Sequence, residues 1–154
     1  MSHQIKIRYA VPNEAEALSQ IAIKAKAYWG YPENLMKVWK PTLTFSPKYF
    51  NENESWVAVV DNRPVAFYTL QEKAGTGWIE NLWVLPEYIG KGVGRQLFLH
   101  ALSRAREMGY TILQLEADPN AAGFYEKMGM SRIGERRSEA DGQPRVLPIM
   151  EIDL

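Results

Sequence analysis

One stretch, residues 77–108, constrains what this chain can fold into more than any other. It reads GWIENLWVLPEYIGKGVGRQLFLHALSRAREM, which is a strand pattern, a glycine-rich turn and a helix pattern in succession. Apolar and aromatic residues fill the strand pattern, and Pro86 ends it because proline cannot donate to a strand ladder. From Val93 to Met108, apolar residues recur at helical spacing. The order predicts a strand that passes through a turn into the N-terminus of a helix.

The turn carries glycines at alternate positions: Gly90, Gly92 and Gly94. The first N–H groups of a helix lack partners within it, and the helix dipole adds partial positive charge there. Glycine lets a phosphate approach the backbone, and Lys91 and Arg95 can add charge. We therefore predict a phosphate or pyrophosphate ligand, although the spacing matches neither a P-loop nor the GxGxxG dinucleotide fingerprint. A tight turn that needs glycine only for its positive φ is the alternative.

The residues around this turn resemble the acetyl-CoA motif of the GNAT superfamily of N-acetyltransferases. That motif is a strand, Val-x-Pro, then (Arg or Gln)-x-x-Gly-x-(Gly or Ala), then a helix. Here Gly92-Val93-Gly94 matches its second half, and Ile89 stands where the family usually has Arg or Gln. The resemblance implies acetyl-CoA as the cosubstrate, with its pyrophosphate held mainly by backbone N–H groups.

A second stretch, residues 113–130, reads LQLEADPNAAGFYEKMGM and resembles the second signature of the same superfamily. Asn120, Phe124, Tyr125, Gly129 and Met130 match that signature position by position. Two separated motifs in the family's order are far more specific than either motif alone. On this resemblance, the residues expected to bind the cofactor are Leu82, Trp83, Val84, Ile89, Gly90, Lys91, Gly92, Val93, Gly94, Arg95, Asn120, Phe124 and Tyr125.

The resemblance also implies catalytic roles. A backbone N–H at a bulge of the central strand, within 82–84, would polarise the thioester carbonyl. Tyr125 would act as the general acid that protonates the departing thiolate, and Glu80 as the general base, acting through water. Tyr125 could instead be a core aromatic residue, Glu80 a solvated one, and Asn120 a helix cap. Lower-ranked candidates for the base are Glu116 and Asp118.

In this superfamily the first two helices and the last hairpin usually select the acceptor. Tyr28 and Trp29, together with Glu80, are therefore the predicted substrate-binding residues. Aromatic side chains could form a lid over an apolar or cationic acceptor, or could simply pack against the sheet. Three arginines near the end of the chain could bind an acceptor carboxylate or be solvated; these are Arg136, Arg137 and Arg145.

Periodicity along the chain predicts a strand, two helices, three strands, a helix, a strand, a helix and two strands. This is an α/β (α+β) pattern and also the order of the GNAT fold. We expect a mixed, mostly antiparallel twisted sheet of about seven strands with helices on both faces, in one domain over residues 1–154. We expect Pro64 to block strand pairing and residues 139–142 to form the final turn.

The composition of the chain argues against several classes of protein and of functional site. Basic and acidic residues number 18 each, which argues against a nucleic-acid or membrane-surface binder. Cysteine is absent, so disulfides and thiolate chemistry are excluded. His3 and His100 lack metal-ligand spacing with other residues, and we predict no metal site. With no signal-peptide pattern or long apolar run, the expected location is the cytoplasm.

The predicted function is transfer of an acetyl group from acetyl-CoA to an amine of a small molecule or peptide, by direct attack through a tetrahedral intermediate. The alternative is a non-catalytic domain of the same fold that binds or senses acyl-CoA. Ile89 is the best argument for that alternative. We expect a monomer or a homodimer.

Overall fold

The computed structural model describes residues 4–154, which divide into two compact units. The first unit comprises residues up to Thr69 together with Asn81–Leu97. The second comprises Leu70–Glu80 and Phe98–Leu154. The single domain expected over 1–154 stays a prediction, and His3 lies outside the described residues.

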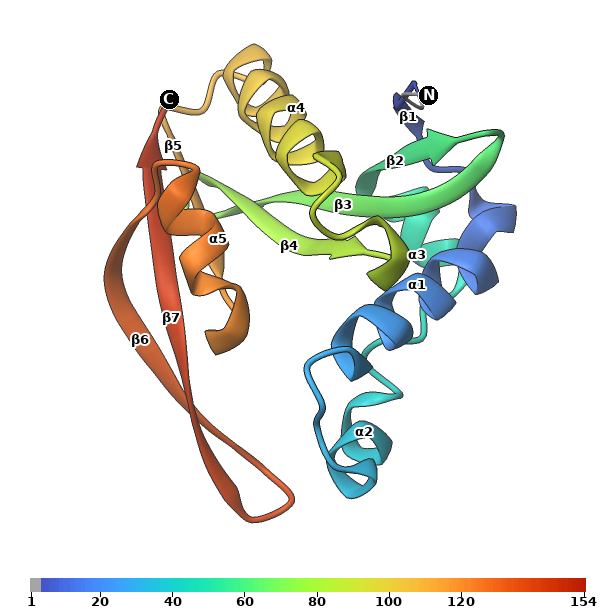
Figure 1. Cartoon of the computed structure of the whole chain (residues 1–154). Coiled ribbons are helices and arrows are strands. Elements are labelled where there is room, and N and C mark those ends of the chain that lie inside the picture. The colour runs from blue at the N-terminus through green and yellow to red at the C-terminus, as the bar shows by residue number, and fades with distance from the viewer. Residues whose placement is uncertain (1–3) are drawn as a thin grey trace. The chain divides into compact units, whose positions relative to one another are not determined.

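The elements follow the predicted order along the chain, except that a further short helix, α3, lies before the run of three strands (Figure 1). The first unit holds β1 (Lys6–Tyr9), η1 (Pro12–Glu14), α1 (Ala15–Ala27), α2 (Glu33–Trp39), α3 (Pro47–Glu52), β2 (Glu54–Val60) and η2 (Pro86–Tyr88). Three elements contribute residues to both units: β3 (Arg63–Lys73), β4 (Thr76–Val84) and α4 (Val93–Glu107). The second unit holds β5 (Ile112–Glu116), η3 (Pro119–Ala121), α5 (Ala122–Lys127), β6 (Ser131–Ala140) and β7 (Gln143–Asp153).

The strands form a seven-stranded sheet in the order β1-β2-β3-β4-β5-β7-β6. β1 pairs antiparallel with β2, and β7 pairs antiparallel with both β5 and β6. β4 and β5 run parallel, because α4 carries the chain back between them. The prediction of a mixed sheet of about seven strands with helices is therefore confirmed.

Each unit has its own fully buried apolar side chains. In the first unit these come from α1, the sheet and the start of α4: Leu18, Val57, Val65, Phe67, Tyr68 and Leu97. In the second they come from α4, β5 and β7: Phe98, Leu113, Leu115 and Met150. The alternating burial of β5 matches the period of two that the sequence shows.

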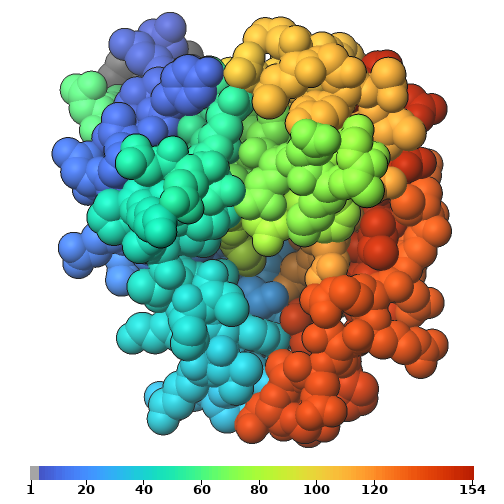
Figure 2. Space-filling model, turned by 180° about the vertical axis from the view of Figure 1, so that it is seen from behind, coloured from blue at the N-terminus to red at the C-terminus, as the bar shows by residue number. Residues whose placement is uncertain are grey.

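The hairpin of β6 and β7 is longer than predicted. Its turn consists of Asp141 and Gly142, both with positive φ, rather than of four residues. Asp-Gly favours such two-residue turns because their twist matches that of the strands. Ala140 therefore pairs with Gln143, and β6 places an exposed, charged face on the surface (orange in Figure 2).

Pro64 differs from expectation as well. It is the second residue of β3 rather than a break before that strand. A proline at a strand's beginning is tolerated because the N–H group it lacks is needed less there.

None of the helices in the described part of the chain combines the length and apolar composition that a membrane span requires.

Glu14 fixes the passage from β1 to the first helical turn. Arg8 Nη1 and Nη2 donate to its two carboxylate oxygens at 2.9 Å, and the Val11 N–H donates to Oε1 at 3.0 Å. Burial alone would raise the pKa of Glu14, but these hydrogen bonds and the charge of Arg8 outweigh burial and lower the pKa. Folding therefore favours the ionised carboxylate.

We expect Glu14→Gln to lower the free energy of unfolding by about 0.5–1 kcal/mol at pH 7. Because the folded pKa is lowered, this stabilisation is present above the unfolded pKa of about 4.3 and is lost as pH falls through the folded value. Urea unfolding of both proteins at pH 7 and near pH 3 measures the difference. An equal difference at the two pH values would contradict this account.

Candidate functional site

The glycine-rich turn lies in the first unit and joins η2 to α4. Gly90 and Gly92 have φ of 80° and 82°, a region that side chains with a Cβ avoid. A Cβ built at either position meets nothing within 4 Å, so backbone conformation and not crowding requires glycine here. Gly94 lies within α4, which begins at Val93 as predicted. The turn therefore presents an open backbone surface at a helix N-terminus.

Residues flanking the turn are mostly exposed. Lys91 and Arg95 are exposed, and the Lys91 ammonium lies 5.6 Å from the centre of the Tyr88 ring. Ile89 is 42% exposed and has an extended backbone. Its side chain cannot replace the hydrogen bonds of the usual Arg or Gln, and its own N–H group already donates to the Pro86 carbonyl at 3.2 Å.

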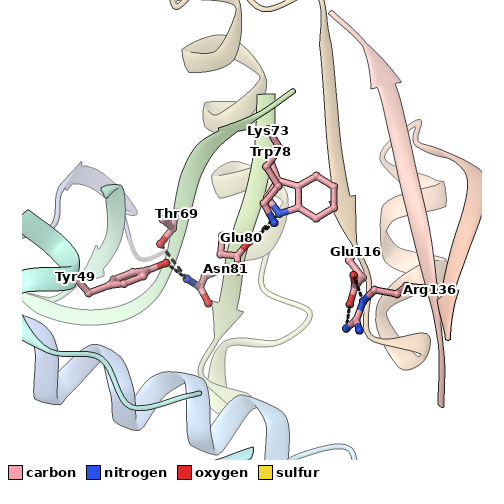
Figure 3. A network of polar contacts seen from close by, with 8 residues as sticks. All are labelled: Tyr49, Thr69, Lys73, Trp78, Glu80, Asn81, Glu116 and Arg136. Carbon is pink, nitrogen blue, oxygen red and sulfur yellow. Dashed lines mark hydrogen bonds and ion pairs between the residues drawn. The ribbon is translucent and has the colours of Figure 1, made fainter. Parts of the chain in front are cut away.

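β4 directs successive side chains to opposite faces. Asn81 is buried and Glu80 is exposed, as expected of neighbours that lie on opposite faces of a strand. Glu80 Oε2 accepts from Lys73 Nζ at 3.2 Å and from Trp78 Nε1 at 2.8 Å (Figure 3). Both contacts fall on one oxygen of the Glu80 carboxylate.

The part of β4 beyond Glu80 carries the predicted carbonyl donors. The parallel register pairs Gly77–Ile79 with Leu113–Leu115, and β4 continues to Val84. Leu82, Trp83 and Val84 are half-buried, and Trp83 Nε1 donates to Asn81 Oδ1 at 3.1 Å. The bulge expected at 82–84 stays a prediction.

The second motif lies wholly in the second unit. Asp118 Oδ1 accepts from the Asn120 N–H at 2.9 Å and from Asn120 Nδ2 at 3.0 Å, so Asn120 is held in the turn before α5. Tyr125 on α5 is buried, with ring contacts to Phe98 and Phe124. Burial raises the pKa of the Tyr125 phenol well above its ordinary value, and the negative charge of Asp118 raises it further. Tyr125 therefore holds its proton at neutral pH.

Two of the three arginines named from the sequence are engaged with carboxylates. Arg136 on β6 makes a two-pronged contact with Glu116 on β5, with both distances 2.7 Å (Figure 3). Arg145 on β7 lies 3.5 Å from Asp118, and both of these side chains are largely buried. These ion pairs compete with the predicted binding of an acceptor carboxylate.

The aromatic residues expected to contact the acceptor are at the end of α1. Tyr28 and Trp29 are 52% and 39% exposed, with ring centres 5.3 Å apart. Their exposure is compatible with the predicted role, which stays a prediction. Among residues 4–154, no group of three or more histidine, cysteine, aspartate or glutamate side chains could hold a metal ion.

The sequence interpretation missed two polar groupings. The first is buried and joins Ser55, Thr69 and Asn81 across β2, β3 and β4. The sequence feature that could have predicted this grouping is a single polar residue, at a position expected to face the core, in each of three apolar strands. The second is the pair of Asp118 and Arg145, which local patterns could not reveal because 27 positions separate the residues in the numbering.

Comparison with known proteins identifies the family. The acetyltransferase (GNAT) family profile matches residues 21–130. The peptidyl-lysine N-acetyltransferase YjaB of Salmonella typhimurium is 34% identical over 105 residues, covering 68% of this chain and 67% of the relative.

Solved structures agree on the fold. A GCN5-related N-acetyltransferase of Rhodopseudomonas palustris matches with a TM-score of 0.84 at 23% identity, covering 100% of this chain and 99% of that one. The PaiA N-acetyltransferase of Thermoplasma acidophilum, solved in complex with coenzyme A, matches with a TM-score of 0.77 at 25% identity, covering 98% and 99%. The predicted family is thus confirmed: the chain belongs to the acetyltransferase (GNAT) family.

Proposed function

We propose that this protein transfers the acetyl group of acetyl-CoA to a primary amine of a small molecule or peptide. The observation that carries the proposal is the glycine turn, whose two positive-φ glycines expose the backbone at the N-terminus of α4. Such a terminus suits the pyrophosphate of coenzyme A because N–H groups and the helix dipole both favour an anion. Family membership supports the same cosubstrate.

The proposed reaction is direct attack. The amine nitrogen bonds to the thioester carbonyl carbon, and an oxyanion forms that backbone N–H groups of 82–84 stabilise. Collapse of the oxyanion breaks the carbon–sulfur bond. The neutral form of the amine attacks and then gives up its second proton to a base, for which we propose Glu80 acting through water. The sulfur gains a proton from Tyr125, and the phenolate takes one back from solvent. We assign the pantetheine contact to Asn120 and acceptor contacts to Tyr28 and Trp29.

Amine chemistry and the name of a relative support the proposed class of acceptor. An amine of lysine type has a pKa of about 10.4, so it arrives protonated and must lose one proton before it attacks and a second one after the carbon–nitrogen bond has formed. The name of the 34%-identical relative, a peptidyl-lysine N-acetyltransferase, favours a lysine side chain among the candidate amines. The cytoplasmic location, and the choice between monomer and homodimer, stay predictions.

Calorimetry with acetyl-CoA tests the proposal without knowledge of the acceptor. We expect the wild type to bind at micromolar affinity, which corresponds to about −8 kcal/mol. Gly92→Ala should weaken binding by about tenfold or more, since the new Cβ projects into the open space beside the turn where the anion would lie.

Gly142→Ala provides the matched control. Gly142 has a φ of 76°, and a Cβ there also meets nothing within 4 Å. Both variants should lose about 1–2 kcal/mol of stability, as a left-handed residue with a Cβ does. Only Gly92→Ala should affect binding. Absence of binding by the wild type would overturn the proposal, and equal binding by the two variants would remove the turn from the site.

A second candidate function is a non-catalytic acyl-CoA-binding or -sensing domain. Ile89 favours it, because this position cannot supply the side-chain donor that the family motif usually has. Such a domain would bind acetyl-CoA through the glycine turn but would need neither a base nor an acid.

A further inference from the structure

A chain of hydrogen bonds crosses the first unit beneath β4. It joins Asn81 on β4 to Thr69 on β3 and Ser55 on β2, which are 8%, 0% and 4% exposed, and it also reaches Tyr49 on α3. The interstrand contacts measure 3.2 Å between Asn81 and Thr69 and 2.8 Å between Thr69 and Ser55. Figure 3 shows the amide of Asn81 between Tyr49 and Thr69. Buried polar groups in such a network fix one another's orientation.

The donors in this network can be assigned from chemistry. The indole N–H of Trp83 can only donate, so the Asn81 atom 3.1 Å from it must be the carbonyl oxygen Oδ1. The two amide hydrogens of Asn81 are then directed to Tyr49 Oη at 2.9 Å and Thr69 Oγ1 at 3.2 Å. The Asn81 amide therefore has one orientation.

The Ser55 end of the network supports the same assignment of donors and acceptors. Ser55 Oγ donates to the Asn53 carbonyl at 3.3 Å, so the hydroxyl hydrogen of Thr69 is the one shared with Ser55. Thr69 Oγ1 is thereby left as an acceptor toward Asn81 Nδ2. If the Asn81 amide were flipped, its NH2 group would face the indole N–H of Trp83, and two donors would lie opposite each other.

The network also connects β4 to α3. The ring of Tyr49 packs against Phe45 and Phe50, with ring centres 4.9 Å and 5.2 Å away. Asn81 joins the hydroxyl oxygen of this packed ring to the indole of Trp83. Trp83 is the middle residue of the segment 82–84 assigned above to the thioester carbonyl.

We propose that Asn81 is a positioning residue for the acyl end of acetyl-CoA. By binding Trp83 on one side and Tyr49 on the other, it holds segment 82–84 in the conformation that receives the thioester. This inference rests on the proposed function. It assigns Asn81 no contact with the reacting atoms, and it places the acyl group and the pyrophosphate under the control of different residues.

Comparing the affinities of a variant for acetyl-CoA and for coenzyme A distinguishes a positioning role of Asn81 from a general loss of stability. Asn81→Leu keeps a similar volume and removes all three contacts. We expect it to weaken acetyl-CoA binding by about tenfold while changing coenzyme A binding by less than about twofold, since the two ligands differ only in the acyl group. Trp83→Phe, which removes the indole donor, should shift the same ratio, and the double variant should show a non-additive loss.

Thr69→Val is the matched control, because it breaks the same buried network without removing the contacts of Asn81 to Trp83 or Tyr49. It should destabilise the protein by an amount similar to Asn81→Leu and leave the ratio of the two affinities unchanged. A ratio unchanged in Asn81→Leu, or shifted equally by Thr69→Val, would overturn the inference. Failure of the wild type to bind either ligand would instead overturn the proposed function, and this inference with it.

Discussion

Tyr125→Phe is expected to lower turnover by about 10²- to 10⁴-fold, the range that a positioned general acid contributes. Affinity for acetyl-CoA should stay within about twofold of the wild type, because the role proposed for the hydroxyl is to protonate the leaving sulfur in the transition state and not to bind the thioester. The physical basis is the environment of Tyr125: burial and the charge of Asp118 both raise its pKa. The phenol therefore keeps its proton until negative charge develops on the sulfur.

The measurement has two stages. Thiol release from acetyl-CoA is first screened against small amines and lysine-containing peptides, and kcat and KM are then determined with the best acceptor. Tyr9→Phe is the matched control, since Tyr9 is 52% exposed on β1 and stacks on Trp56, outside the proposed machinery. It should leave both constants unchanged.

The outcome also decides between the two candidate functions. Loss of turnover with retained binding supports the enzyme and the role of Tyr125. Unchanged turnover in Tyr125→Phe would contradict that role while leaving acetyl transfer established. Binding of acetyl-CoA by the wild type without thiol release for any amine would favour the sensing domain, for which Ile89 is the argument.

Local sequence patterns predicted the elements well, because each had a strong local signal. Pro86 after an apolar run, followed by glycines and a helical repeat from Val93, left few alternatives for the course of β4, the turn and α4. The final turn was predicted to be too long: it consists of Asp141 and Gly142 alone, a dipeptide that strongly favours a two-residue hairpin turn. The predicted turn spanned the polar run 139–142, whereas β6 extends to Ala140, which pairs with Gln143.

The site was predictable to the extent that it follows motifs. Helix position and motif spacing placed Tyr125 and the glycine turn on the correct elements. The partners of the site residues were not predictable, because they come from elements distant in sequence. Asn81 meets Tyr49 across 32 positions, and the contact of Glu80 with Lys73 depends on the register of one hairpin. Such contacts depend on how the strands align, which periodicity does not specify.

Asp118→Ala is the substitution expected to have the largest effect on stability among the charged residues of the second unit, about 2–4 kcal/mol. Asp118 and Arg145 have side chains only 9% and 14% exposed, so removing the carboxylate leaves a largely buried guanidinium without this counter-charge. The variant also loses the two hydrogen bonds that hold Asn120. Urea unfolding of the wild type and the variant at pH 7 measures the difference in free energy.

Glu116→Ala is the matched control, because it removes the carboxylate of a more exposed ion pair in the same unit. Glu116 and Arg136 form the shorter pair, at 2.7 Å against 3.5 Å, and share two hydrogen bonds. Their side chains are 24% and 53% exposed, however, so water replaces much of what the substitution removes. We expect a loss of only about 0.5–1 kcal/mol. A larger loss for Glu116→Ala would show that hydrogen-bond geometry, rather than burial, governs these ion pairs.

The proposed acid role of Tyr125 gives substitutions of Asp118 a second readout. Asp118→Asn keeps an oxygen that can accept from the Asn120 N–H but removes the charge that helps to raise the pKa of Tyr125. The phenol should then lose its proton at lower pH than in the wild type, because an adjacent negative charge no longer opposes the phenolate. If Tyr125 is the acid, the alkaline decline of kcat moves to lower pH in Asp118→Asn. If the alkaline decline of kcat stays at the same pH, Asp118 does not influence the acid and has only a structural role.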